Sequence, residues 1–154
     1  MPDQRVLMGN EAVAWGLVTG GCQVVTSYPG TPSSEILPAV LDLRAELGAD
    51  VSVEWSLKEM VAFQVALGAS YAGKRSATIM KQVGLNVAAD ALMSSAYTGC
   101  KGGFVIVSAD DPGPYSSQTE QDTRGFAQFA KVPVLDPATP QEACAYAKLA
   151  VALS

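Results

Sequence analysis

Three residues that can take part in chemistry closely follow short, apolar, strand-like runs of the sequence: Thr31, Glu59 and Lys81. A hydroxyl donates and accepts hydrogen bonds, a carboxylate can share a proton, and an ammonium group pairs with anions. If the three runs are strands of one parallel sheet, the loops that follow them lie at the edge where such sheets bind ligands. These residues are therefore the first candidates for a site.

The chain has no histidine, and its cysteines at 22, 100 and 144 are far apart without a Cys-x-x-Cys pair. These facts exclude a Ser-His-Asp triad and a histidine-ligated metal. They also exclude a disulfide framework or an iron–sulfur or zinc site built from this chain alone. The expected chemistry uses carboxylates, Lys, Tyr, hydroxyls or a bound cofactor, with no metal ligands of the chain's own.

Composition bounds the class of protein. The 154 residues are 49% hydrophobic and 16% charged, which suits one domain with a substantial core. The net charge of −5, without a basic tract, argues against binding to nucleic acid. The first residues lack the apolar core of a signal peptide, and no apolar run is long enough to span a membrane. A cytoplasmic protein is expected.

The order of elements predicts the fold. Five strand-like segments, near 22–27, 51–55, 75–80, 103–108 and 132–135, alternate with helical stretches near 9–20, 33–47, 56–72, 84–98, 119–130 and 139–153. This alternation is typical of an α/β fold. We expect a three-layer, doubly wound domain with a mainly parallel sheet of about five or six strands. Val105-Ile-Val107 is continuously apolar, as expected for a central strand that is covered on both faces.

The stretch Tyr28-Pro-Gly-Thr-Pro32 ends the first strand-like run. Gly30 permits unusual dihedral angles, Thr31 is placed to cap a helix, and Pro32 suits a first helical turn. The pattern predicts a strand, a tight turn and a helix N-terminus, which attracts anions. A plain βα turn without a ligand explains the same residues.

Two interpretations are open for Glu59. Ser56-Leu-Lys-Glu59 has the spacing of a capping box, as do Ser117-Gln-Thr-Glu120 and Thr139-Pro-Gln-Glu142. Glu59 differs in its place, because it opens a very apolar helix at the carboxyl end of a strand. There a carboxylate can be partly desolvated and act as a functional acid.

Two further interpretations concern charged residues near strand ends. Lys81 either faces the ligand edge from the end of its strand or is simply solvated. Asp110 and Asp111 are expected to begin a turn at Pro112. Trp55, which lies beside the candidate site, is interpreted as a core or interface residue.

Five stretches, in order along almost the whole chain, together resemble the pyrimidine-binding domain of the 2-oxoacid:ferredoxin oxidoreductases, most closely the alpha subunits of the indolepyruvate type. They are Tyr28-Pro-Gly-Thr-Pro-Ser-Ser-Glu35, Glu54-Trp-Ser-Leu-Lys-Glu59, Gly68-Ala-Ser-Tyr-Ala-Gly73, Met80-Lys-Gln-Val-Gly-Leu-Asn86 and Ala109-Asp-Asp-Pro-Gly-Pro-Tyr-Ser-Ser-Gln-Thr-Glu-Gln-Asp122. The resemblance implies that residues 1–154 are one pyrimidine-binding domain of a longer chain or a multi-subunit enzyme. Such an enzyme oxidatively decarboxylates an aryl 2-oxoacid, like indolepyruvate, to an acyl-CoA.

The resemblance also implies roles for residues. Glu59 would hydrogen-bond N1′ of the aminopyrimidine ring of thiamine diphosphate, and Thr31 would meet the oxoacid end of the substrate. Further cofactor contacts are expected from Tyr28, Pro29, Gly30, Gln82, Gly84 and Asn86.

Three positions depart from the family pattern. Many relatives with pyruvate-type substrates carry an arginine near Ala109, so Lys81 is the alternative cation for the substrate carboxylate. Indolepyruvate-type sequences typically have histidine at the positions of Gln82 and Tyr115, which leaves the indole substrate open.

The chain lacks the Gly-Asp-Gly and Asn motif that holds Mg²⁺ and diphosphate, and it lacks a ferredoxin-like cysteine run. The implied Mg²⁺ and iron–sulfur clusters therefore belong to other domains or subunits. Expected partners are a diphosphate-binding domain or subunit, ferredoxin, the 2-oxoacid and coenzyme A, in an oligomer. Two alternatives are the alpha chain of a non-oxidative decarboxylase of the sulfopyruvate type and a non-catalytic docking domain.

Overall fold

The computed structural model describes residues 5–115 and 117–154. Within them the strands form one parallel sheet in the order β2-β1-β3-β4. The strands are β1 (Val24–Ser27), β2 (Ser52–Trp55), β3 (Ser76–Lys81) and β4 (Phe104–Ala109). The chain moves outward from β1 to β2 and then crosses back to β3. The β1–β3 neighbourhood is therefore the point where the strand order reverses, which is where open α/β sheets bind ligands.

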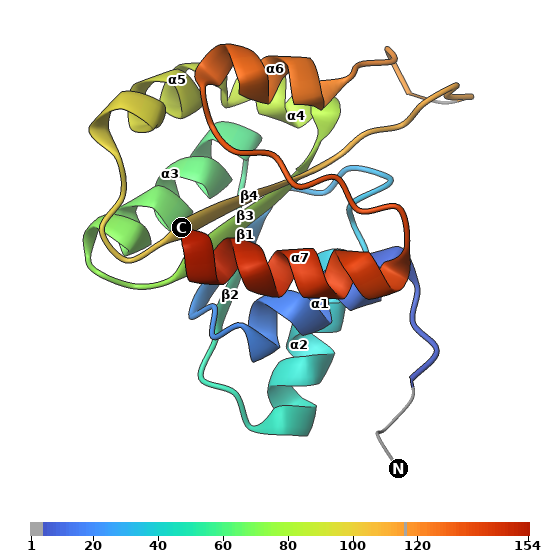
Figure 1. Ribbon diagram of the computed structural model, residues 1–154, viewed down its shortest axis with the longest axis vertical. Coiled ribbons are helices and arrows are strands. Elements are labelled where there is room, and N and C mark those ends of the chain that lie inside the picture. The colour runs from blue at the N-terminus through green and yellow to red at the C-terminus, as the bar shows by residue number, and fades with distance from the viewer. Residues whose placement is uncertain (1–4, 116) are drawn as a thin grey trace.

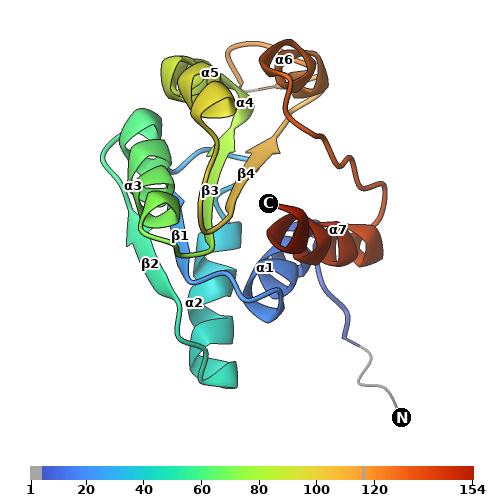
Figure 2. The same ribbon diagram turned by 60° about the vertical axis from the view of Figure 1, so that its left-hand side comes forward.

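Helices cover both faces of the sheet, which confirms the predicted three-layer α/β architecture (Figures 1 and 2). One face carries α1 (Gly9–Thr19), α2 (Ile36–Leu47) and α7 (Pro140–Leu153). The other carries α3 (Glu59–Tyr71), α4 (Gln82–Val87), α5 (Ala89–Thr98) and α6 (Thr123–Ala130). Each face of the sheet buries its own apolar cluster, because successive side chains of a strand point to opposite faces.

Two buried side chains illustrate these clusters. Phe63 of α3 meets Phe104 of β4 edge to face, with ring centroids 4.8 Å apart. On the opposite face Cys22 is buried, and desolvation raises the pKa of its thiol to about 11. This thiol packs as a small apolar group at neutral pH.

The prediction of a fifth strand at 132–135 is wrong, since this segment has no ladder partner and no regular structure. The prediction that Val105-Ile-Val107 belongs to a central strand is wrong too, because β4 lies at the edge of the sheet and every residue in it is partly exposed. The Ser154 hydroxyl accepts a hydrogen bond from the Phe104 N–H and donates one to the Phe104 carbonyl. A side chain here satisfies the backbone groups that another strand would otherwise pair.

Three predicted helices have different boundaries. The stretch 84–98 forms two helices, α4 and α5, which Ala88 separates. The helix predicted from residue 119 begins at Thr123, where the Asp122 side chain accepts a hydrogen bond from Arg124 N at the N-cap. The helix predicted from residue 33 begins at Ile36.

Candidate functional site

The segment after β1 is a compact turn, which is stabilised by hydrogen bonds of two serines within it. The Ser33 hydroxyl donates to the Gly30 carbonyl at 2.8 Å, and the Gly30 N–H donates to the Ser34 hydroxyl at 2.9 Å. The Asn10 side chain of α1 donates to the carbonyl of Pro32 at 2.8 Å and fixes the turn from outside. The sequence contains these serines but gives no signal that Asn10 takes part.

The predicted roles of Gly30 and Thr31 in this turn are wrong in detail. Thr31 is exposed and does not cap α2, whose N-cap is Glu35. Gly30 has no left-handed φ; instead, a Cβ on it would lie 3.1 Å from Lys81 Cβ. Glycine is therefore favoured by the close approach of the turn to the end of β3, where the two elements meet at the reversal point of the sheet.

Glu59 is the first residue of α3, and its predicted capping box is absent. The N-cap is Lys58, and the Ser56 hydroxyl donates to Glu54 at 3.0 Å instead of capping the helix. No hydrogen bond or ion pair of the Glu59 carboxylate is found within residues 5–115 and 117–154. The half-buried side chain lies against α4, because a Cβ on Gly84 would be 2.6 Å from Glu59 Cγ and 2.9 Å from Glu59 Oε1.

The other two capping boxes have different outcomes. Thr139 caps α7 by accepting from the Glu142 N–H at 3.2 Å, while Glu142 accepts from Ala138 N, so a cap is confirmed there. Ser117 and Glu120 open no helix; Glu120 instead accepts from the Gly113 N–H at 3.0 Å. Spacing alone thus identified one true helix cap in three.

Lys81 is not simply solvated. Its side chain is 16% exposed, its ammonium donates a hydrogen bond to the Ser117 hydroxyl, and its Nζ lies 3.9 Å from Asp111 Oδ2. The Ser117 hydroxyl in turn donates to the Asp111 carboxylate. This cluster was not predicted from the sequence, because Ser117 and Asp111 lie within a long irregular connection whose acidic residues were interpreted as the start of a turn.

Gln82 and Asn86 are held by the same connection. Gln82 is fully buried, and its Nε2 donates to the Thr119 carbonyl at 3.1 Å, whereas its Oε1 is buried without a hydrogen-bond partner in the described part of the chain. Asn86 Nδ2 donates to Gln121 Oε1 at 2.8 Å. A buried acceptor without a partner is energetically costly, and a donor on a ligand or a water molecule would remove that cost.

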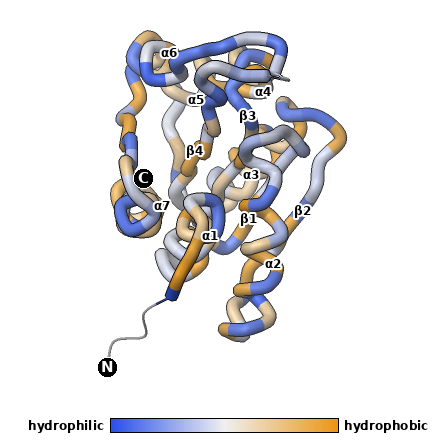
Figure 3. The backbone as a smooth tube through the Cα atoms, turned by 90° about the vertical axis from the view of Figure 1, so that its right-hand side faces the viewer, coloured by the Kyte–Doolittle hydropathy of each residue, from blue (hydrophilic) through white to orange (hydrophobic). Residues whose placement is uncertain are grey.

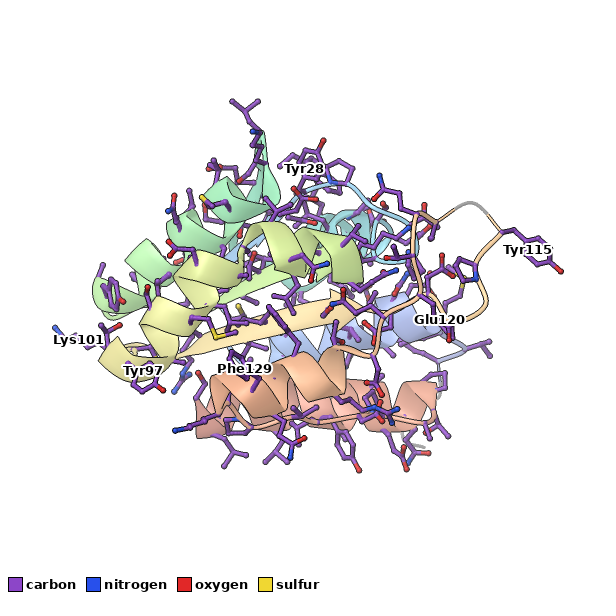
Figure 4. All side chains as sticks on the ribbon, turned by 90° about the horizontal axis from the view of Figure 1, so that it is seen from above. Tyr28, Tyr97, Lys101, Tyr115, Glu120 and Phe129 are labelled. Carbon is purple, nitrogen blue, oxygen red and sulfur yellow. The ribbon has the colours of Figure 1, made fainter. Side chains whose placement is uncertain are left out.

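The connection from β4 to α6 is itself fixed at its base. Asp110 accepts hydrogen bonds from Thr123 N at 2.9 Å and from the Thr123 hydroxyl at 2.7 Å. In Figure 3 the part that leads into α6 is coloured hydrophilic, and Figure 4 shows Tyr115 pointing away from the body of the protein. Near the start of α6, hydrogen bonds from the Arg124 side chain hold the pKa of Asp122 below its usual value.

The structure brings the predicted residues together in two contacts, Glu59 with Gly84 and Gly30 with Lys81. Tyr28 is half-buried and Pro29 is exposed, both in the turn after β1 (Figure 4 labels Tyr28). Within the described residues no hydrogen bond joins this turn to Glu59.

Exposed apolar side chains lie on α3 and just before it. Leu57 is 88% exposed, Trp55 is 43% exposed, and Val61 and Val65 follow along the outer side of α3. Val61 and Val65 are one turn apart within α3 and share that side of the helix, whereas Leu57 lies just before the helix and Trp55 ends β2. We call these four residues the α3 stripe. Apolar surface of this kind marks interaction sites when it is contiguous.

The described residues contain neither a membrane-spanning helix nor a cluster of metal ligands. No helix in them is long and apolar enough to cross a membrane. Within the same residues no group of three or more His, Cys, Asp or Glu side chains could hold a metal ion. The expected cytoplasmic location stays a prediction.

Comparison with known proteins gives consistent matches. The family described as "Pyruvate flavodoxin/ferredoxin oxidoreductase, thiamine diP-bdg" matches residues 16–154. The indolepyruvate oxidoreductase subunit IorA of Archaeoglobus fulgidus is 53% identical over 152 residues, which cover 96% of this chain and 24% of that protein. The subunit of the same name from Thermococcus kodakarensis is 50% identical over 154 residues, with 99% and 24% covered.

A solved structure supports the fold. The 2-oxoglutarate:ferredoxin oxidoreductase from Magnetococcus marinus aligns with a TM-score of 0.80 at 21% identity, over 94% of this chain and 26% of that chain. The present chain thus spans about a quarter of the length of these relatives. Since the family match covers most of its residues, the chain belongs to the thiamine diphosphate-binding family of the pyruvate flavodoxin/ferredoxin oxidoreductases.

Proposed function

We propose that this chain is the pyrimidine-binding portion of a thiamine diphosphate-dependent 2-oxoacid:ferredoxin oxidoreductase that acts on an aryl 2-oxoacid such as indolepyruvate. The observation that carries the proposal is the Glu59 carboxylate, which stands at the ligand edge of the sheet without a hydrogen-bond partner among the described residues. A carboxylate left free of a capping role is available to bind a ring nitrogen.

Glu59 and its surroundings suit an aminopyrimidine ring. The carboxylate can hold a proton shared with the ring nitrogen N1′, and Gly84 leaves the space that Glu59 needs against α4. The buried Gln82 Oε1 supplies an acceptor that still needs a donor. Tyr28, Pro29, Gly30 and Asn86 complete the proposed cofactor contacts, and bound thiamine diphosphate would supply the carbon nucleophile for the 2-oxoacid carbonyl.

Lys81 and Thr31 are the proposed contacts for the substrate. Lys81 ends β3 beside the turn after β1 that contains Thr31, so a cation and a hydroxyl follow the two strands at the reversal point of the sheet. The ammonium group can pair with the carboxylate of the oxoacid, while the hydroxyl can donate to an oxygen of the same ligand.

The proposed site is half of a complete one. Because the chain lacks a diphosphate motif, a diphosphate-binding domain or subunit must complete the site with Mg²⁺, and iron–sulfur clusters elsewhere must pass electrons to ferredoxin. Coenzyme A would receive the acyl group. We propose that the α3 stripe, whose Trp55 and Leu57 lie just before Glu59 in the sequence, is covered by the diphosphate-binding unit in the oligomer.

Two measurements test this proposal. Calorimetric titration of the isolated chain should give weak binding of thiamine diphosphate with Mg²⁺, and tight Mg²⁺-dependent binding would contradict a half-site. In the full-length enzyme, Leu57→Glu should reduce retained cofactor and activity, because it buries a charge in the proposed contact. Leu149→Glu, on the exposed side of α7, is the matched control and should leave both unchanged.

A further inference from the structure

The Lys81 ammonium is already engaged by a group that resembles its proposed ligand. A carboxylate, that of Asp111, lies 3.9 Å from Lys81 Nζ, and the Ser117 hydroxyl bridges the two groups by accepting from Lys81 and donating to Asp111. We propose that Asp111 is an internal competitor for the anion site at Lys81 and so sets the affinity of that site for a 2-oxoacid carboxylate. This inference rests on the proposed function of Lys81.

The burial of the cluster makes the competition strong enough to measure. The side chains of Lys81 and Asp111 are 16% and 30% exposed, so water screens their attraction only in part. The stem of Lys81 passes close to the turn at Gly30, where an added Cβ would lie 3.1 Å from Lys81 Cβ and 3.7 Å from Lys81 Cδ. An incoming carboxylate must therefore displace the Ser117 hydroxyl and tolerate the nearby negative charge of Asp111.

The connection keeps Asp111 in place independently of Lys81. Its base is fixed by Asp110 and Thr123, and its later part is fixed to α4 through Gln82 and Asn86. Asp111 is thus presented to Lys81 by a braced segment of the chain. It acts on the substrate only through Lys81, which makes it a positioning residue that determines affinity.

The test compares two charge-neutralising changes in the same connection of the full-length enzyme. Asp111→Asn keeps the shape and an acceptor for Ser117 but removes the competing charge. It should lower KM for phenylpyruvate or indolepyruvate by about 2- to 5-fold with little change in kcat, the size of effect expected for a partly exposed ion pair. Glu120→Gln removes an equal charge without contacting Lys81 and should leave KM unchanged.

A readout that needs no substrate separates this inference from the proposed function. Limited acetylation of the full-length protein, followed by peptide mass spectrometry, should label Lys81 faster in Asp111→Asn than in the parent or in Glu120→Gln. Equal labelling in all three would refute the engagement of Lys81. Faster labelling with an unchanged KM would also overturn the competitor role. Lys81→Met should raise KM and abolish the gain from Asp111→Asn; a persistent gain would place the anion site elsewhere.

Discussion

Replacing Glu59 with glutamine separates a role in chemistry from a role in helix stability. Glu59 is the first residue of α3, and its carboxylate makes no capping hydrogen bond there. Glutamine has nearly the same shape and fits the same space against Gly84. A neutral amide, however, cannot share a proton with a ring nitrogen as a carboxylate does.

Glu59→Gln should change stability only slightly and turnover strongly. The change removes one negative charge from the first turn of a helix, which costs about 0.3–1 kcal/mol of stability. For a domain of this size, that cost lowers the melting temperature by about 1–4 °C. In the full-length enzyme we expect turnover to fall by roughly 10²- to 10⁴-fold, the range for loss of a positioned acid or base.

A matched control is available in α7. Glu142 also lies in a first turn, where it accepts a hydrogen bond from Ala138 N. Glu142→Gln should cost similar stability and leave turnover unchanged, as measured by steady-state kinetics and thermal unfolding. If Glu59→Gln keeps nearly full activity with cofactor bound, the role of Glu59 is wrong, and a non-catalytic docking domain becomes the better interpretation.

Two other substitutions and one labelling experiment test the surrounding structure. Gly84→Ala should displace the Glu59 side chain and lower turnover without lowering the melting temperature, because alanine favours a helix; an unchanged turnover would contradict the packing. Gly68→Ala, in α3 with open space around it, should raise the melting temperature and leave turnover unchanged. Alkylation at pH 8 should label Cys100 at least about 100-fold faster than Cys22, since at a pKa of about 11 roughly one thiol in 1,000 is ionised.

The order of the elements was predictable because apolar periodicity and turn residues act locally. The alternation of strand-like and helical segments gave the parallel three-layer fold, and the loops after β1, β2 and β3 were correctly placed at one edge of the sheet. The fifth strand was not predictable in the same way. Val132 to Leu135 have strand-forming residues, yet a strand exists only where a neighbour pairs with it, and local sequence does not report the neighbour.

The loops that carry the candidate site were predicted to share one edge of the sheet, as they do, but the contacts of their side chains were not predicted. A Ser-x-x-Glu spacing is compatible with a cap, yet Ser56 bonds to Glu54 and α3 begins at Glu59 instead. The engagement of Lys81 by Ser117 depends on how a long connection folds back over α4. Such contacts join residues far apart in the sequence, so spacing rules carry no information about them.

Lys81 and Glu59 differ in whether this chain supplies them with hydrogen-bond partners, and a last prediction follows from this difference. Lys81 is engaged by the β4–α6 connection, whereas among the described residues the Glu59 carboxylate has no hydrogen-bond partner and the α3 stripe is exposed. A carboxylate beside exposed apolar surface costs little while water reaches it. Once a partner covers the stripe, that charge becomes costly unless the covering group brings a hydrogen-bond donor.

Retention of cofactor and burial of the stripe should therefore depend on each other. We expect the losses of cofactor affinity caused by Glu59→Gln and Leu57→Glu to be non-additive in the full-length enzyme. The double variant should then retain about as much thiamine diphosphate as the single variant that binds it less tightly. Retained cofactor can be measured after gel filtration by fluorescence of its oxidised form. Independent losses that add in free energy would mean that Glu59 and the α3 stripe face different ligands, and the half-site would have to be redrawn without the stripe.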